Sequence, residues 1–178
     1  MSVQNSSRTM DSHLIRRLTL TGILMGMNIA LSSFGIPVPG GHLYLNDIVI
    51  VAAALILEPR EAFIVGGIGA FIGDLLFYPT PMFVSLVTHG IQAVVISVLS
   101  RRILQDRPRT AAYIAAGIGA LINVVGYTIG RAFIYSTMEA AMLKLPYQFL
   151  QAGVGALLGV ILVYQSGVKE QAEKILNL

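Results

Sequence analysis

The stretch that decides the fold is Gly40–Leu76, GGHLYLNDIVIVAAALILEPREAFIVGGIGAFIGDLL. It begins with a polar cluster and continues as apolar sequence up to a charged tetrad, EPRE, at residues 58–61. A second, glycine-rich apolar run then leads to Asp74. Two apolar arms joined by a short charged turn predict a hairpin of membrane helices. The polar ends of such a hairpin lie on the same side of the bilayer.

The composition of the whole chain supports a membrane protein. Of its 178 residues, 55% are hydrophobic and 12% are charged, and the mean hydropathy is +0.75. So little polar surface cannot cover a soluble globule, which indicates a polytopic membrane protein. The length suits one domain. Cysteine is absent, which excludes disulfides and thiolate chemistry, and we expect neither a cofactor nor a metal ion.

Breaker residues and charge clusters divide the chain into six predicted helices. They cover about residues 13–34, 45–57, 61–78, 82–104, 110–134 and 138–164. The predicted fold is therefore all-α, a six-transmembrane-helix bundle over residues 13–165. Residues 1–12 are expected to form a polar N-terminal segment, disordered or surface-bound and without a removable signal peptide. Residues 166–178 are expected to form a C-terminal tail with an amphipathic pattern.

The basic residues give the orientation. With a cytoplasmic N-terminus, ten of the twelve lysines and arginines fall inside, and only Arg131 and Lys144 fall outside. The positive-inside rule then places both the N- and C-termini in the cytoplasm. The basic residues sit at helix ends and form no continuous patch, so we expect membrane lipid and no nucleic acid among the partners.

Polar side chains within the predicted helices gather in their outer halves. Each is costly near the bilayer centre unless it is paired or faces a cavity. The candidate substrate-binding residues are Asn46, Thr88, His89, Gln92, Asn123, Tyr127, Arg131, Tyr147 and Gln151, with His42 in the loop before the second helix. An apolar inner half beneath them predicts an outward-opening pocket without a polar exit. This favours a substrate-capturing subunit over a channel or a self-sufficient carrier, which normally binds near the midplane between repeats.

Several of these residues have a second interpretation. Asn123, Tyr127 and Arg131 are spaced four apart and share a helical face, but Arg131 is as well suited to reaching the headgroups. It is equally suited to pairing with Asp74 or Glu139.

The histidines and Asp47 also leave alternatives open. His89 offers a ring nitrogen either to a ligand or to a helix–helix hydrogen bond. His42 suits an exposed loop equally well. Asp47 and Asp74 suit either structural partners of backbone amides or of Arg131, or contact with the ligand. Tyr147 and Gln151, four residues apart, are expected to face the pocket together.

Small residues mark a candidate docking surface on the first helix. Gly22, Gly26 and Ala30 recur every four residues, which leaves a flat groove that another helix can approach closely. Because this stripe begins near the cytoplasmic side, we predict that it faces a partner subunit.

Five motifs carry a family resemblance. They are GHLYLND at 41–47, LEPR at 57–60, GGIGA at 66–70, GDLL at 73–76 and LVTHG at 86–90. Together they resemble S components of energy-coupling factor (ECF) vitamin transporters, over most of residues 14–165. Within that superfamily the chain is similar to the riboflavin-type branch, which includes S components for hydroxymethylpyrimidine and pyridoxine.

The resemblance implies a six-helix subunit in a prokaryotic plasma membrane that captures a vitamin or vitamin precursor at the outer face. ATP-driven uptake would need a transmembrane coupling (T) subunit and two cytoplasmic ATPases. The resemblance also implies that the small-residue stripe docks on the coupling subunit. The loop after the first helix would cap the pocket, and the fourth, fifth and sixth helices would line it.

The function expected from the sequence is therefore ligand capture, and not catalysis. No GxSxG, HExxH or GKS/GKT motif occurs, so we expect no catalytic residues. The favoured ligand is a pyridoxine-type B6 vitamer or hydroxymethylpyrimidine, because one histidine, several amides and several tyrosines suit a neutral heterocycle. The alternatives are a small self-sufficient permease or channel, and an S component for riboflavin or another vitamin.

Overall fold

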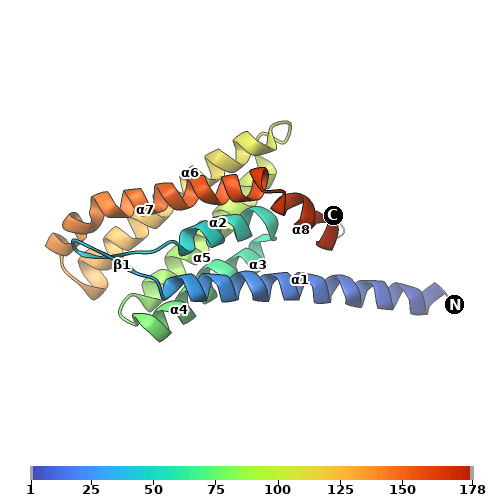
Figure 1. Ribbon diagram of the computed structural model, residues 1–178, viewed down its shortest axis with the longest axis horizontal. Helices are drawn as coiled ribbons and strands as arrows, with labels where there is room; N and C mark the ends of the chain where they lie inside the picture. The colour runs from blue at the N-terminus through green and yellow to red at the C-terminus, as the bar shows by residue number, and fades with distance from the viewer. Residues whose placement is uncertain (1, 177–178) are drawn as a thin grey trace.

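The computed structural model describes residues 2–176, and the side chains of residues 12–176. Its helices run roughly along one long axis, with both chain ends toward the same end of the molecule (Figure 1). The elements in chain order are α1 Ser2–Ser32, β1 Ile36–Val38, β2 Gly41–Leu43, α2 Asn46–Ile56, α3 Pro59–Phe63, the π-helix η1 Ile64–Ile68, α4 Gly69–Phe77, α5 Met82–Arg102, α6 Pro108–Gly130, the π-helix η2 Arg131–Tyr135, α7 Met138–Gln165 and α8 Val168–Leu176. The predicted all-α class is confirmed, with one short β-hairpin added to it.

In the described part of the chain, four helices are long and apolar enough to cross a membrane. They cover residues 12–32, 82–102, 108–135 and 138–165. The predicted third helix is three helical segments in direct succession, α3, η1 and α4, over residues 59–77. The predicted second helix is the shorter α2. Residues 2–12, predicted as a polar surface segment, continue α1, and the amphipathic tail forms α8.

Helix α2 is the core of the bundle. Its sequence is apolar all round, which is typical of a buried helix, and every residue from Asn46 to Ile56 except Ile48 is buried. It packs against α1, α5 and α7. Glycine on α7 allows this close approach, because a Cβ at Gly159 would lie 2.7 Å from Cβ of Val51.

The two π-helices interrupt longer helices next to polar side chains. A π-turn changes the hydrogen-bond register of a helix and often marks a functional position. In η1 the carbonyl of Val65 accepts a 2.6 Å hydrogen bond from Nδ2 of the buried Asn28 on α1. In η2 the altered turn carries Arg131 and Tyr135, and both residues line the cavity described below.

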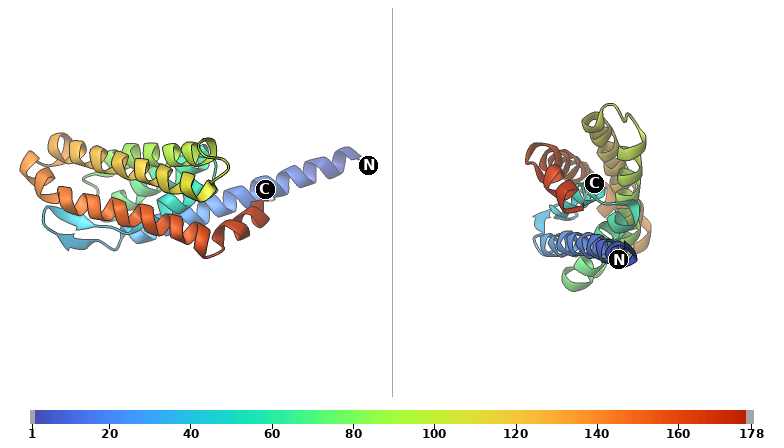
Figure 2. Two further views of the ribbon diagram at one scale, coloured as in Figure 1. Left: turned by 90° about the horizontal axis from the view of Figure 1, so that it is seen from above. Right: turned by 90° about the vertical axis from the view of Figure 1, so that its right-hand side faces the viewer.

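The loop predicted after the first helix is an antiparallel hairpin, in which Ile36 pairs with Leu43. Its turn contains Gly40 at φ +78°, a backbone conformation that favours glycine. The hairpin lies at the end of the bundle away from the two chain ends (Figure 2). Each strand has only three residues, and β1 contains Pro37. Strands this short show no alternation of apolar and polar residues, so the sequence did not reveal them.

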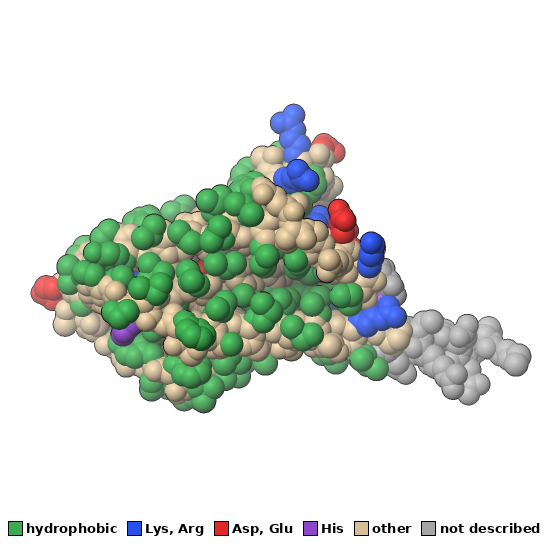
Figure 3. Space-filling model, viewed as in Figure 1, with side chains coloured by type: hydrophobic (Ala, Val, Ile, Leu, Met, Phe, Trp, Pro, Cys, Tyr) green, Lys and Arg blue, Asp and Glu red, His purple; other side chains and the backbone are tan. Residues whose placement is uncertain are grey.

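The opposite end of the bundle carries most of the charge (Figure 3). Arg17 of α1 bridges the turn between α2 and α3, at 2.8 Å from Oε2 of Glu58 and 2.5 Å from Oε1 of Glu61. The hydrogen bond from Arg17 lowers the pKa of Glu58. Arg101 of α5 caps the C-terminus of α2 by donating to the carbonyls of Ile56 and Leu57 at 3.1 and 2.7 Å. These contacts tie α1 and α5 to the C-terminal end of α2.

The fit between α2 and α7 gives a first prediction. Gly159→Leu places a side chain against Val51 and should lower the free energy of unfolding by about 1–3 kcal/mol through overpacking. The measurement is thermal unfolding of the detergent-solubilised protein. Gly153→Leu on the same helix is the control, since nothing described lies within 4 Å of its added Cβ, and it should leave the melting temperature unchanged or raised. Equal melting temperatures for both variants would contradict the packing.

Candidate functional site

A cavity lies between the hairpin and the adjoining ends of the helices. Its lining residues are Ser32, Gly41, His42, Tyr44, Asn46, Asp74, Tyr78, Pro81, His89, Tyr127, Arg131, Tyr135, Lys144, Gln148 and Gln151. The cavity volume is about 30 Å³, which is room for about one or two water molecules and not for a heterocyclic ring.

The carboxylate of Asp47 organises the polar groups beneath the cavity. It is 1% exposed and lies in the first turn of α2, where the helix dipole favours a negative charge. Its Oδ1 accepts from Gln92 Nε2 at 3.2 Å and from Asn123 Nδ2 at 3.0 Å. Its Oδ2 accepts from Gln151 Nε2 at 3.0 Å. One carboxylate thus joins α2, α5, α6 and α7.

These bonds fix which way each amide points. Because its NH₂ group faces Asp47, Gln92 turns Oε1 toward His89 Nδ1, at 2.8 Å. With a hydrogen on Nδ1 this contact is a hydrogen bond to Gln92, and in that neutral tautomer Nε2 is an acceptor. No hydrogen bond from a described residue reaches Nε2, and the ring lines the cavity. The oxygen of Asn123 in turn accepts from Gln148 at 2.6 Å.

A second polar cluster lies on the neighbouring wall. The hydroxyl of Ser85 on α5 bonds to the carboxylate of Asp74 on α4 and lies 2.5 Å from the hydroxyl of Tyr127 on α6. The Tyr127 ring meets the His89 ring edge-on, with centroids 5.3 Å apart. Asp74 therefore braces the wall, and it is not paired with Arg131.

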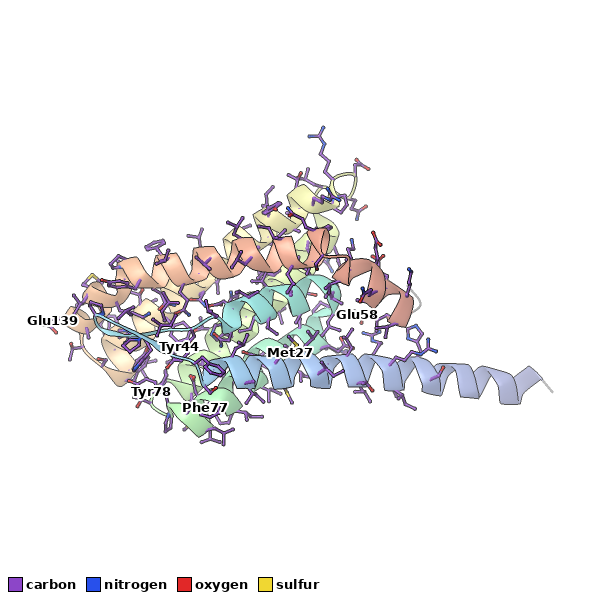
Figure 4. The ribbon with its side chains drawn as sticks, viewed as in Figure 1. Met27, Tyr44, Glu58, Phe77, Tyr78 and Glu139 are labelled. Carbon is purple, nitrogen blue, oxygen red and sulfur yellow. The ribbon has the colours of Figure 1, made fainter. Side chains whose placement is uncertain are left out.

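The hairpin is held over the cavity by a few polar contacts. Arg131 Nη1 donates to the carbonyl of Gly40 at 2.6 Å, and the backbone N–H of Tyr44 donates to Gln151 Oε1 at 3.1 Å. The ring centroids of His42 and Tyr78 are 6.0 Å apart. Tyr44 and Tyr78 lie toward the end of the bundle opposite Glu58 (Figure 4). Burial raises the pKa of Tyr44 to about 12, so its phenol stays protonated.

Unpaired buried polar atoms gather at this cavity. Among the described side chains, four such atoms lack a hydrogen-bond partner: Asn46 Oδ1, Glu61 Oε2, Tyr135 OH and Lys144 Nζ. All but Glu61 belong to residues that line the cavity. Buried polar groups are nearly always hydrogen-bonded, so a cluster of unpaired ones indicates a place where a ligand or water supplies the partners.

The structure brings most of the predicted site residues together. Those that line the cavity are His42, Asn46, His89, Tyr127, Arg131 and Gln151. Gln92 and Asn123 lie directly beneath it in the Asp47 network. Thr88 is buried beside Gly126 on α6 and lines no part of the cavity. Tyr147 is half-buried outside the lining.

The register of α7 explains the position of Tyr147. Lys144, Gln148 and Gln151 follow one another at spacings of four and three and share the inward face, which leaves Tyr147 at its edge. Lys144, Gln148 and Tyr135 also line the cavity, although they were not among the substrate-binding residues predicted from the sequence. The spacing of the polar residues on α7 was the available signal for Lys144 and Gln148, whereas the π-turn that places Tyr135 left no signal.

The small-residue stripe on α1 faces outward. Gly22, Gly26 and Ala30 are all exposed, and a Cβ added to either glycine would meet nothing described within 4 Å. The neighbouring side chains of Ile23 and Met27 are exposed as well. The stripe therefore takes no part in packing within the described chain.

The fold and this site define a membrane-embedded, ligand-binding subunit. The chain belongs to the ECF-type riboflavin transporter S component family, whose model matches residues 12–167. It is thus a multi-pass protein of the prokaryotic cell membrane and a transporter subunit, not an enzyme. This confirms the family predicted from the sequence motifs.

Two relatives extend the comparison. Over 88 residues the chain is 38% identical to the thiamine precursor transporter HmpT of Lactococcus lactis subsp. cremoris (strain MG1363), a match that covers 47% of this chain and 53% of that protein. It therefore spans about half the length of this relative. The chain is also 27% identical over 132 residues to an uncharacterized protein of Pyrococcus woesei, which covers 70% of this chain and 82% of the relative.

The Asp47 network gives a second prediction. Asp47→Asn replaces one acceptor oxygen by an NH₂ donor. That donor faces the NH₂ group of Gln151, or those of Gln92 and Asn123, depending on which oxygen is replaced. The unsatisfied groups should cost about 1–3 kcal/mol of stability. Thermal unfolding in detergent measures this loss. Asp106→Asn, in the exposed loop between α5 and α6, is the control and should leave the melting temperature unchanged. A melting temperature of Asp47→Asn equal to that of the wild type would contradict the network.

Proposed function

We propose that this protein is the S component that captures a thiamine precursor, hydroxymethylpyrimidine, at the outer face of the membrane. The observation that carries the proposal is the cavity whose lining residues have unpaired buried polar atoms. The similarity to a thiamine precursor transporter supports this ligand class. Uptake then requires a transmembrane coupling subunit and two cytoplasmic ATPases as partners.

The chemistry of one wall suits the amino group of an aminopyrimidine. Asn46 Nδ2 already bonds to Asn28 Oδ1 at 3.2 Å, which leaves its Oδ1 as a free acceptor. His89 Nε2 is a second acceptor. An exocyclic amino group carries two hydrogens and satisfies both, whereas a single hydroxyl of a pyridoxine-type ring satisfies only one. This favours hydroxymethylpyrimidine, with pyridoxine as the second candidate.

The transmembrane arrangement that fits this function has six crossings and cytoplasmic termini. The continuous helix over residues 59–77 is ~28 Å long at ~1.5 Å per residue, close to the ~30 Å apolar thickness of a bilayer. Helix α2 is shorter, but it is surrounded by other helices and has little contact with lipid. The basic side chains at the end with the chain termini support a cytoplasmic position for that end.

Capture requires the hairpin to move. A cavity of about 30 Å³ cannot admit a ring, and the polar contacts that hold the hairpin involve Gly40 and Tyr44. Their loss opens the site toward the outer face, and the ligand then replaces the lost contacts. The outward-facing stripe on α1 is proposed as the surface that docks on the coupling subunit, because close helix packing in membranes uses small residues.

Ligand binding tests the proposal directly. The purified protein in detergent should bind hydroxymethylpyrimidine more tightly than pyridoxine or riboflavin, measured by isothermal calorimetry. His89→Ala removes a ligand acceptor and should weaken binding about tenfold or more, which corresponds to about 1.4 kcal/mol. His13→Ala, at the opposite end of the bundle, is the matched control. Tighter binding of riboflavin or pyridoxine would replace the proposed ligand.

Transport tests the role of the partners. In liposomes the protein alone should bind the ligand without ATP-driven uptake, and co-reconstitution with coupling subunit and ATPases should restore uptake. Gly26→Leu fills the stripe and should reduce uptake at least severalfold while leaving ligand affinity unchanged. Gly117→Leu adds a side chain to an equally open position on α6 and should have no effect. Uptake by the protein alone would favour a self-sufficient permease.

A further inference from the structure

Lys144 of α7 lines the cavity and has no role yet in the proposed ligand binding. Its side chain is 2% exposed, its residue lines the cavity, and its Nζ has no hydrogen-bond partner among the described residues. Lysine is almost never fully buried without a pair. A buried, unpartnered ammonium facing a cavity therefore requires an explanation.

The protein groups around Lys144 do not supply an acceptor. The nearest cation is Arg131 of η2, and both residues contact Gly40 of the hairpin: a Cβ at Gly40 would lie 3.1 Å from Cβ of Lys144, and Arg131 donates to the Gly40 carbonyl. The carboxylates that line or underlie the cavity are already engaged. Asp47 of α2 accepts from three amides, and Asp74 of α4 accepts from Ser85.

The neutral polar side chains near the cavity already make hydrogen bonds with residues other than Lys144. Gln148, one turn further along α7, donates to Asn123, and Tyr127 of α6 shares a hydrogen bond with Ser85. His89 of α5 directs Nδ1 to Gln92. Among the described residues that line the cavity, Tyr135 of η2 is the other one with an unpaired buried donor.

The residues that line the cavity include both acceptors and donors without protein partners. Asn46 on α2 has an unpaired acceptor, Oδ1, and His89 on α5 lines the cavity with no hydrogen bond to Nε2 from a described residue. Unpaired donors, Lys144 Nζ and Tyr135 OH, lie on α7 and η2. A ligand that satisfies both sets carries a hydrogen-bond donor and an oxygen acceptor.

We propose that Lys144 is the residue that recognises the oxygen substituent of the ligand, with Tyr135 beside it. This deepens the proposed function and rests on it. The ring binds with its amino group toward Asn46 and His89 and its hydroxymethyl oxygen toward Lys144. The ammonium gains the acceptor that the protein lacks, so the site selects heterocycles that carry an oxygen at this position and rejects those with a methyl group.

A ligand-and-variant cycle tests this assignment. Hydroxymethylpyrimidine and its deoxy analogue, 4-amino-2,5-dimethylpyrimidine, differ only in that oxygen. The wild type should bind the first compound at least tenfold more tightly. Lys144→Met, of similar length and without a donor, should bind the two compounds within about twofold of each other and should keep the wild-type affinity for the deoxy analogue. Lys169→Met on α8 is the matched control and should keep the wild-type preference.

The melting temperature without ligand completes the test. Because Lys144→Met removes a buried unpaired charge, the empty variant should melt no lower than the wild type. A variant that melts lower and binds neither compound identifies Lys144 as structural and overturns the assignment. Retention of the full preference in Lys144→Met, or equal affinity of the wild type for both compounds, also overturns it. Failure of the wild type to bind either compound instead refutes the proposed function.

Discussion

The carboxylate of Asp47 is the constraint on which the polar part of this structure depends. It lies at the N-terminus of the central helix and is buried beneath the cavity. Being an acceptor only, it forces three amides to present their NH₂ groups to it, and their oxygens then face His89, Gln148 and the backbone of Tyr44. The position of a single charge thus sets the hydrogen-bonding pattern of the site wall and of the hairpin above it.

The buried helix α2, which carries Asp47, is also the centre of the apolar packing. Helix α2 is hydrophobic on all sides and is held close to its neighbours by glycines such as Gly159. Most residues of this layer are buried and apolar, whereas the polar side chains of the Asp47 network lie at one end of it.

The residues that line the cavity differ in which unpaired hydrogen-bonding atoms they carry. The unpaired acceptor Oδ1 of Asn46 belongs to α2, and the unpaired donors of Lys144 and Tyr135 belong to α7 and η2. The cavity between them is small. Arg131 and Gln151 both line this cavity and hold the hairpin.

The sequence by itself determined the class of protein, the all-α fold, the approximate helix positions and the family, because hydropathy, helix breakers and motifs are local properties of the chain. It also placed His89, Asn123 and Arg131 in the halves of their helices that meet at the cavity. Only the tertiary structure decided which polar atoms remain unpaired, that Lys144 and Gln148 face inward where Tyr147 does not, and that the loop is a hairpin. The physical reason is that hydrogen-bond satisfaction and helix rotation depend on neighbours far apart in the chain, and no local pattern records those neighbours.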